Sequence, residues 1–436
     1  MNLKYYYNLA KNDLFPICRS ITGDGIRKSL SMIKQEFPEL KILKIKSGSK
    51  VYDWKVPPEW IIKDAFIKDK NNKTIVDFKK NNLHVVNFSK PIKRKMQFKY
   101  LKKKLYYNKD LPKSIPYITS YYNKDWGFCI SYSHYKKLLK TYKADDFFYI
   151  DIDSNFNNSG NLVFGEYFLK GKSKKEILIS TYLCHPSMAN NELSGPIVSM
   201  SLIKYFKSLR KLEKSIRFIF IPETIGSISY ISKNISELKK NVIGGFNLSC
   251  IGDERKHSCM LSKYKNTPSD EAIIEAYKKL KIKKFKIYSF LERGSDERQY
   301  NSPGVDLPIA SIFRSKYGTY PEYHSSLDNF NLVTLKGITG GFNVVKESIK
   351  ILLKNKYPLS KIVCEPNLGK RGLYPTLSRK KSFNKMIDAR KYLDFLQYSD
   401  GKNSLNKIFR LINVDNIRGN KIYKKLLKNK ILLSNS

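Results

Sequence analysis

The sequence predicts an α/β protein with a mixed sheet flanked by helices, and three observations lead to this class. Between residues 140 and 355, apolar runs of strand length alternate with segments in which apolar residues recur at helical spacing. Several strand-like runs contain almost no polar residue, which is typical of strands buried on both faces of a parallel sheet. With 436 residues, the chain is long enough for two or three domains and a large core.

Residues 177–195 show the repeating unit most clearly. An apolar run leads to His185, a stretch of small and amide-bearing residues follows, and apolar residues at helical spacing then continue to Phe206. We therefore predict a strand, a loop and a helix. His185 is expected at the carboxyl end of the strand, where open α/β sheets bind their ligands.

Two changes in residue composition divide the chain into domains. Residues 45–135 are rich in turns and aromatic residues, and residues 65–69 and 74–78 predict a β-hairpin, so we expect an inserted β-rich domain there. Residues 1–44 and 136–360 then form the α/β domain. After a linker marked by proline and glycine, residues 365–436 contain three short helical segments in the order of a winged-helix unit.

The net charge of +44 is compatible with a nucleic-acid partner. The lysines are scattered through every segment, however, which favours solvated surfaces over one polyanion-binding face. The six cysteines show no spacing typical of disulfides or of metal knuckles, and they predict free thiols in a reducing compartment. No run of about 18 apolar residues occurs, so we expect a cytoplasmic protein without a membrane span.

Four residues with metal-binding side chains stand where a predicted strand gives way to a loop: His185, Glu223, Asp253 and His324. Parallel strands would bring these positions to one edge of the sheet. Two imidazoles and two carboxylates at one edge are typical of a zinc site. Each residue alone has a plainer explanation, because a histidine at a strand end often bonds to a backbone carbonyl and a glutamate after proline often caps a helix.

Several motifs support a more specific assignment. In chain order they are LFPICRSITGDG at 14–25, GSKVYDWKVPPEW at 48–60, His185 with NELSG at 191–195, PETIGS at 222–227, GDE at 252–254, GSDERQ at 294–299, EYHSSLD at 322–328 and LGKRGLYP at 368–375. In the motifs from His185 to residue 328 the chain resembles zinc aminopeptidases and glutaminyl cyclases. With the motifs at 14–25, 48–60 and 368–375 included, it more closely resembles bacterial aminopeptidase-like proteins that have an inserted β-rich domain and a C-terminal winged helix.

The resemblance implies a zinc aminopeptidase-like fold and a role for several residues. His185 and Asp253 would bind one zinc ion and His324 a second. Glu223 would be the general base or a ligand, because the family has two adjacent glutamates where this chain has one. Asn191 stands where the family has an aspartate that bridges two zinc ions, and Ser187 stands where it has an aspartate that orients the histidine.

The expected activity is zinc-dependent hydrolysis of a peptide or amide with a free amine, weakened by Asn191 at the bridging position. Carboxylates that could hold the amine are Asp296, Glu297 and Glu322. Two alternatives remain open at this point. The chain could be a catalytically degenerate protein that binds a peptide or small amine and uses the winged helix for a partner, or it could bind DNA through residues 380–434.

Overall fold

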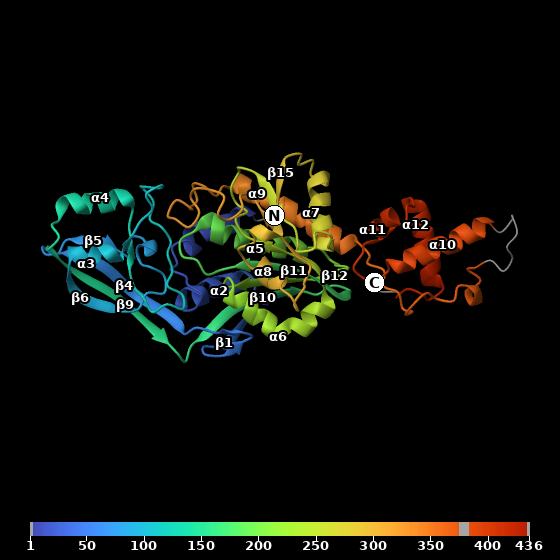
Figure 1. Ribbon diagram of the computed structural model, residues 1–436, viewed down its shortest axis with the longest axis horizontal. Helices are drawn as coiled ribbons and strands as arrows, with labels where there is room; N and C mark the ends of the chain where they lie inside the picture. The colour runs from blue at the N-terminus through green and yellow to red at the C-terminus, as the bar shows by residue number, and fades with distance from the viewer. Residues whose placement is uncertain (1–2, 375–382, 434–436) are drawn as a thin grey trace.

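The computed structural model describes residues 3–374 and 383–433 of the chain. Figure 1 shows three parts along the long axis of the molecule, with a β-rich part at one end, a large sheet in the middle and a helical part at the other end. The expected α/β class, with an inserted β-rich part and a C-terminal helical part, is therefore confirmed.

The middle part is built on an eight-stranded mixed sheet. Its strands are β1 (Lys41–Lys46), β10 (Asn161–Leu169), β11 (Ser173–Tyr182), β12 (Lys214–Ile221), β13 (Val242–Leu248), β14 (His257–Met260), β15 (Phe285–Tyr288) and β16 (Ile309–Phe313). They lie in the order β1-β10-β12-β11-β13-β16-β14-β15. The four neighbours β12, β11, β13 and β16 run parallel to one another, so their carboxyl ends lie at one edge.

Helices cover both faces of this sheet, which explains why its central strands are so apolar. All residues of β12 and β13 are buried, as the continuous apolar runs predict. The helices of this part are α1 (Leu3–Leu9), α2 (Asp24–Glu36), α5 (Ser194–Lys207), α6 (Ile225–Asn241), α7 (Pro268–Lys279), α8 (Glu297–Tyr300) and α9 (Leu335–Lys354). Helix α9 contacts α1, α5 and α7, whereas α6 contacts α8.

The inserted part is a four-stranded antiparallel sheet in the order β5-β4-β9-β6. Its elements are β4 (Glu59–Asp69), β5 (Thr74–Asp77), β6 (Ile92–Gln97), β9 (Phe147–Asn157), α3 (Phe98–Leu101) and α4 (Tyr132–Thr141). The predicted hairpin is the β4–β5 pair. Short pairs formed by β2 (Lys50–Val51) with β3 (Trp54–Lys55) and by β7 (Leu105–Tyr106) with β8 (Phe128–Cys129) complete it.

The inserted sheet extends beyond residue 135, where the sequence predicted its end. Strand β9 pairs with β4 and β6, so residues 147–157 belong to the inserted sheet and not to the α/β sheet. The buried side chains Phe148, Ile150 and Ile152 join a core with Ala65 and Ile67 that is separate from the main core. Buried and exposed residues alternate along β9, as in a strand with one face in a core. This alternation does not determine which sheet the strand joins.

The C-terminal part contains α10 (Phe383–Gln397), α11 (Leu405–Leu411) and α12 (Asn416–Lys428), as the sequence predicted. Its own core includes Phe395, Ile408 and Leu426. An isolated β-bridge between Ser360 and Leu432 joins the segment before α10 to the segment after α12. Residues 375–382 and 434–436 of the predicted winged-helix segment lie outside the described residues.

Two expectations from composition can be compared with the fold. All six cysteines are free thiols, as their spacing predicted. Among the residues that the structure describes, no helix is both long enough and apolar enough to cross a membrane.

Candidate functional site

Three of the predicted site residues follow strands that are neighbours in the sheet. His185 comes three residues after β11, Glu223 two residues after β12 and Asp253 five residues after β13. His324 lies in the long loop after β16. Because β12, β11, β13 and β16 are parallel and adjacent, these loops leave the sheet at the same edge.

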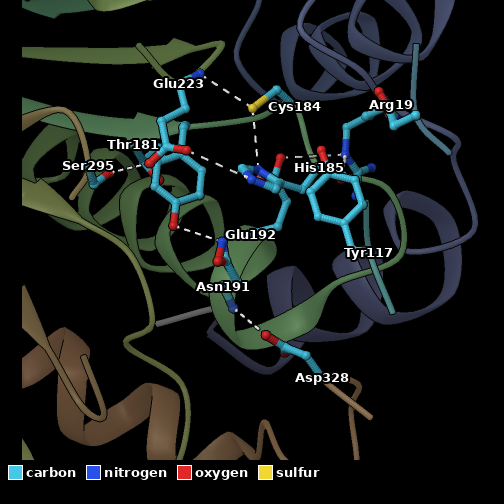
Figure 2. A network of polar contacts seen from close by, with 12 residues as sticks. Arg19, Tyr117, Thr181, Cys184, His185, Asn191, Glu192, Glu223, Ser295 and Asp328 are labelled. Atoms are coloured by element: carbon cyan, nitrogen blue, oxygen red, sulfur yellow. Dashed lines mark hydrogen bonds and ion pairs between the residues drawn. The ribbon is translucent and has the colours of Figure 1, made fainter. Parts of the chain in front are cut away.

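The structure brings His185, His324 and Glu223 together. The two imidazole rings lie 5.4 Å apart between centroids, and Nε2 of His185 is 3.8 Å from Oε2 of Glu223. Nε2 of His324 is buried and has no hydrogen-bond partner. The other carboxylate oxygen of Glu223 accepts a 2.6 Å hydrogen bond from the hydroxyl of Ser295 (Figure 2). The two imidazole rings and the carboxylate of Glu223 are therefore neighbours at this edge.

Glu192 holds the opposite side of His185. Its Oε2 lies 2.8 Å from Nδ1 of His185, and its side chain is fully buried. Ser187, which stands where the family has an orienting aspartate, donates instead to the backbone carbonyl of Phe15. Glu192 therefore takes over the contact with His185 that residue 187 does not make. Sequence reasoning missed this role, although a glutamate in an otherwise uncharged loop was the available signal.

The charges around the two histidines shift their pKa values in opposite directions. Burial alone would lower the pKa of His185, but Cys184 and Glu192 outweigh it and raise that pKa well above 6.5. Burial, followed by the nearby His185, lowers the pKa of His324 to about 3. Burial raises the pKa of Glu223, although His185 and Ser295 oppose that shift. At neutral pH His324 is thus a neutral imidazole with a free Nε2.

Arg19, from the N-terminal motif, lies beneath His185 and is completely buried. Its Nε donates to the backbone carbonyl of His185 at 2.9 Å and lies 3.6 Å from Oε1 of Glu192 (Figure 2). The guanidinium thus compensates the buried charge of the carboxylate that holds His185. Sequence reasoning gave Arg19 no role in the site, although this residue lies in the motif at residues 14–25.

The inserted domain also reaches the site. The ring of Tyr117 lies 5.2 Å from the rings of both His185 and His324, between centroids. Its backbone N–H donates to the carbonyl of His324, and Pro116 forms a β-bridge with Ser325. The loop that carries His324 is thereby fixed to the inserted domain, in a backbone conformation with φ of 54°.

The two remaining predicted ligands, Asp253 and Asn191, differ in whether their side-chain oxygens are free. Asp253 accepts four hydrogen bonds, one from the side chain of Asn190, one from the backbone of Arg255 and two from Ser315. A carboxylate has about four acceptor positions, so none is left over. Asn191 donates to the hydroxyl of Tyr182, and its Oδ1 is buried without a partner.

The three predicted amine-binding carboxylates have different surroundings. Glu297 is buried and accepts five hydrogen bonds, which leaves no free oxygen for an amine. Glu322 forms a two-pronged ion pair with Arg255. Asp296 accepts two hydrogen bonds at Oδ1, whereas its Oδ2 is buried without a partner. Burial, with a contribution from Glu223, raises the pKa of Asp296 to about 7.

The residues at this edge are of the types that bind a zinc ion. Histidine nitrogens are common zinc ligands, and a carboxylate on the far nitrogen of such a histidine is its usual support. His185 and His324 offer two nitrogens, Glu192 offers the support to His185, and Glu223 stands beside His185, where it can act as the general base. A second ion fits poorly, because Asn191 is neutral and Asp253 has no free acceptor position.

A different trio of described residues is a candidate metal site if only the distances between possible ligand atoms are considered. The possible ligand atoms of Cys184, His185 and Glu192 lie within 4.8 Å of one another. Cys184 and Glu192, however, both lie within hydrogen-bonding distance of Nδ1 of His185, so these groups already use that nitrogen. We therefore interpret Cys184 and Glu192 as hydrogen-bonding partners that support His185.

A cleft of about 980 Å³ opens beside the site. It is lined by the N-terminal segment 12–32, by residues 78–83 of the inserted domain, and by Ser187, Ser326 and Asn329. His185, His324 and Glu223 do not line it. The cleft is therefore a neighbour of the site, connected to it through the loops after His185 and His324.

The fold and the site together define an aminopeptidase-like α/β protein that carries a winged-helix unit. The chain belongs to the family described as "Domain of unknown function (DUF4910)", whose model matches residues 7–355. A second family model, "winged helix-turn-helix", matches residues 356–434. The resemblance inferred from the motifs is thereby confirmed for the fold and for the C-terminal part.

Individual relatives agree with this assignment. A protein of Clostridium acetobutylicum, provisionally named as a polysaccharide biosynthesis protein with an aminopeptidase-like domain, is 40% identical over 403 residues, which cover 92% of this chain and 89% of the relative. A crystal structure from the same species, provisionally named a peptidase, has a TM-score of 0.78 at 36% identity and covers 99% of this chain and 96% of its own. BSAP, a zinc aminopeptidase from Bacillus subtilis, has a TM-score of 0.60 at 13% identity, with 81% and 95% of the chains covered, and shares the fold.

Proposed function

We propose that this protein is a single-zinc hydrolase that cleaves an amide bond next to a free amine. The observation that carries the proposal is the convergence of His185, His324 and Glu223, with Nε2 of His324 buried and unpartnered. His185 and His324 would hold the zinc ion through their Nε2 atoms. The aminopeptidase-like fold of the relatives supports the choice of reaction.

The chain's own groups explain how the reaction would proceed. When bound, the zinc ion would polarise the amide carbonyl and lower the pKa of a water molecule to about 7. Glu223 would accept the proton from the attacking water and pass it to the leaving amine. Ser295 fixes one oxygen of Glu223, which keeps the other directed toward His185. Tyr117 covers the imidazoles and keeps bulk water from them.

The free amine of the substrate would bind near Asp296. Among the three carboxylates considered for this role, Asp296 has an oxygen without a partner, and its charge influences Glu223. A protonated amine at this place would pair with the ionised carboxylate and would position the adjacent amide beside Glu223. Peptides with a free N-terminus and small amides with a free amine are the substrate classes that meet this requirement.

A second candidate function is binding without catalysis. It is favoured by Asn191 at the bridging position and by the four hydrogen bonds that occupy Asp253, which together argue against the two-metal site that the family pattern implies. In that case the site would hold a peptide or small amine, and the winged helix would contact a partner.

The discriminating experiment compares wild type with Glu223→Gln on a panel of aminoacyl fluorophores, after metal analysis of both proteins. Glutamine keeps the shape of the side chain but cannot take up the proton, so we expect kcat to fall by about 100-fold or more with zinc content unchanged. Glu322→Gln is the matched control, because its partner is Arg255, and it should retain most of the activity. Wild-type protein that holds zinc but turns over no substrate would favour the binding role.

A further inference from the structure

Arg19 and Glu192 form a buried pair beneath His185. Both side chains are fully buried, and they come from segments that are far apart in the sequence. We propose that Arg19 is a positioning residue that acts through Glu192 to hold His185 in the orientation that binds a metal. This inference rests on the metal-binding role of His185 in the proposed function, but it does not depend on which reaction the site catalyses.

Arg19 holds His185 from two sides. Its Nε donates to the backbone carbonyl of His185 at 2.9 Å, which fixes the main chain immediately after β11. The same nitrogen lies 3.6 Å from Oε1 of Glu192, while Oε2 of Glu192 lies 2.8 Å from Nδ1 of His185. The ring and the backbone of His185 are thus set by one guanidinium, directly in one case and through a carboxylate in the other (Figure 2).

The position of the carboxylate determines which ring nitrogen is free. With Nδ1 held by Glu192, Nε2, the atom that faces Glu223, is the nitrogen on which a metal would displace the proton. Glu192 has no solvent contact, and a buried carboxylate without a cation beside it is strongly unfavourable. Arg19 is the cation beside it, so the metal-binding orientation of His185 depends on Arg19.

Arg19 is itself held by both the N-terminal segment and the inserted domain. Its Nη1 donates to the carbonyl of Leu14. Its backbone carbonyl accepts a 2.9 Å hydrogen bond from Asn87 of the inserted domain, and the side chain of Asn87 also accepts from Ser20. The inserted domain therefore supports His185 from behind through Asn87 and contacts its ring through Tyr117.

The test measures the zinc affinity of the full chain by competition with a chromophoric chelator. We expect Arg19→Met and Glu192→Gln each to weaken zinc binding by about 10- to 100-fold, the effect typical of removing a support from a metal-binding histidine. The double variant should lose less affinity than the product of the two single losses, because the two residues share the contact to Nδ1 of His185. The d–d absorption of the cobalt(II) form should change in the same variants. Arg27→Met is the matched control, since Arg27 pairs with Asp24 and Glu59 away from the site.

Zinc affinity equal to wild type in folded Glu192→Gln and Arg19→Met would overturn the proposal, as would a double variant whose loss is the product of the two single losses. If Arg19→Met does not fold, Glu192→Gln decides by itself, because glutamine has nearly the same shape as glutamate. A wild-type protein that binds zinc and hydrolyses no amide would refute the proposed reaction and leave this inference standing. A wild-type protein without zinc affinity would refute both.

Discussion

Replacing Asn191 with aspartate tests whether this residue limits the site to one zinc ion. The side chain is 1% exposed, donates to the hydroxyl of Tyr182 and leaves its Oδ1 without a partner. In Asn191→Asp, Tyr182 can reverse its role and donate to the new carboxylate, but one hydroxyl donor only partly offsets the cost of burying a charge. Two zinc ions repel each other strongly unless an anion lies between them, and aspartate supplies that anion.

The expected size of the effect follows from burial. An uncompensated buried charge costs about 3–5 kcal/mol, so the zinc-free variant should be less stable than wild type by roughly that amount. Zinc at about 100 times its dissociation constant would return about 2.7 kcal/mol through binding. We therefore expect a lower unfolding midpoint without zinc, a large recovery with zinc, a zinc content that rises toward two ions per chain, and faster amide hydrolysis.

The assay combines thermal unfolding with and without zinc and metal analysis after gel filtration. Asn301→Asp is the matched control, because Asn301 is 3% exposed and donates to two backbone carbonyls away from the histidines. It should lose stability without recovery in zinc. If zinc content, hydrolysis and the zinc-dependent recovery of Asn191→Asp all match those of wild type, Asn191 does not lie at the metal, and the assignment of the loop after His185 is wrong.

Two further predictions concern pH and nucleic acid. Burial, with a contribution from Glu223, raises the pKa of Asp296 to about 7. The folded zinc-free protein therefore holds this proton more tightly than the unfolded chain does. The resulting stabilisation is complete below about pH 4 and is lost as pH rises through 7. Asp296→Asn should therefore raise the unfolding midpoint at pH 8 and change it little at pH 5; an equal change at both pH values would contradict this. Helix α12 exposes Lys421, Lys424, Lys425 and Lys428, and the sequence has no acidic residue between 416 and 430. If this helix binds duplex DNA, replacing the four lysines with alanine should weaken binding, and the salt dependence of binding should fall by the amount expected for up to about four phosphate contacts. The same change at Lys136, Lys137 and Lys140 of α4 and at Lys143, two residues after that helix, should have neither effect. Equal losses in the two variants would indicate nonspecific attraction.

The α/β class and the central strands of the main sheet could be predicted because that information is local. Continuous apolar runs identified strands that are buried on both faces, and the residues after them marked the edge where the site lies. The end of the inserted domain could not be predicted in the same way. Strand β9 is recognisable from its alternating residues, but its pairing with β4 depends on a partner about 80 residues away.

The same distinction between local sequence and tertiary packing applies to the candidate site. The sequence by itself determined that His185, Glu223 and His324 would follow strands of one sheet, because residue type and position after an apolar run are properties of short segments. Only the tertiary structure decided that Asp253 is occupied by four hydrogen bonds, that Glu192 replaces the carboxylate missing at residue 187, and that Arg19 lies beneath both. The physical reason is that burial and hydrogen-bond partners arise from packing between segments far apart in the chain, and these contacts decide which polar groups remain free for chemistry.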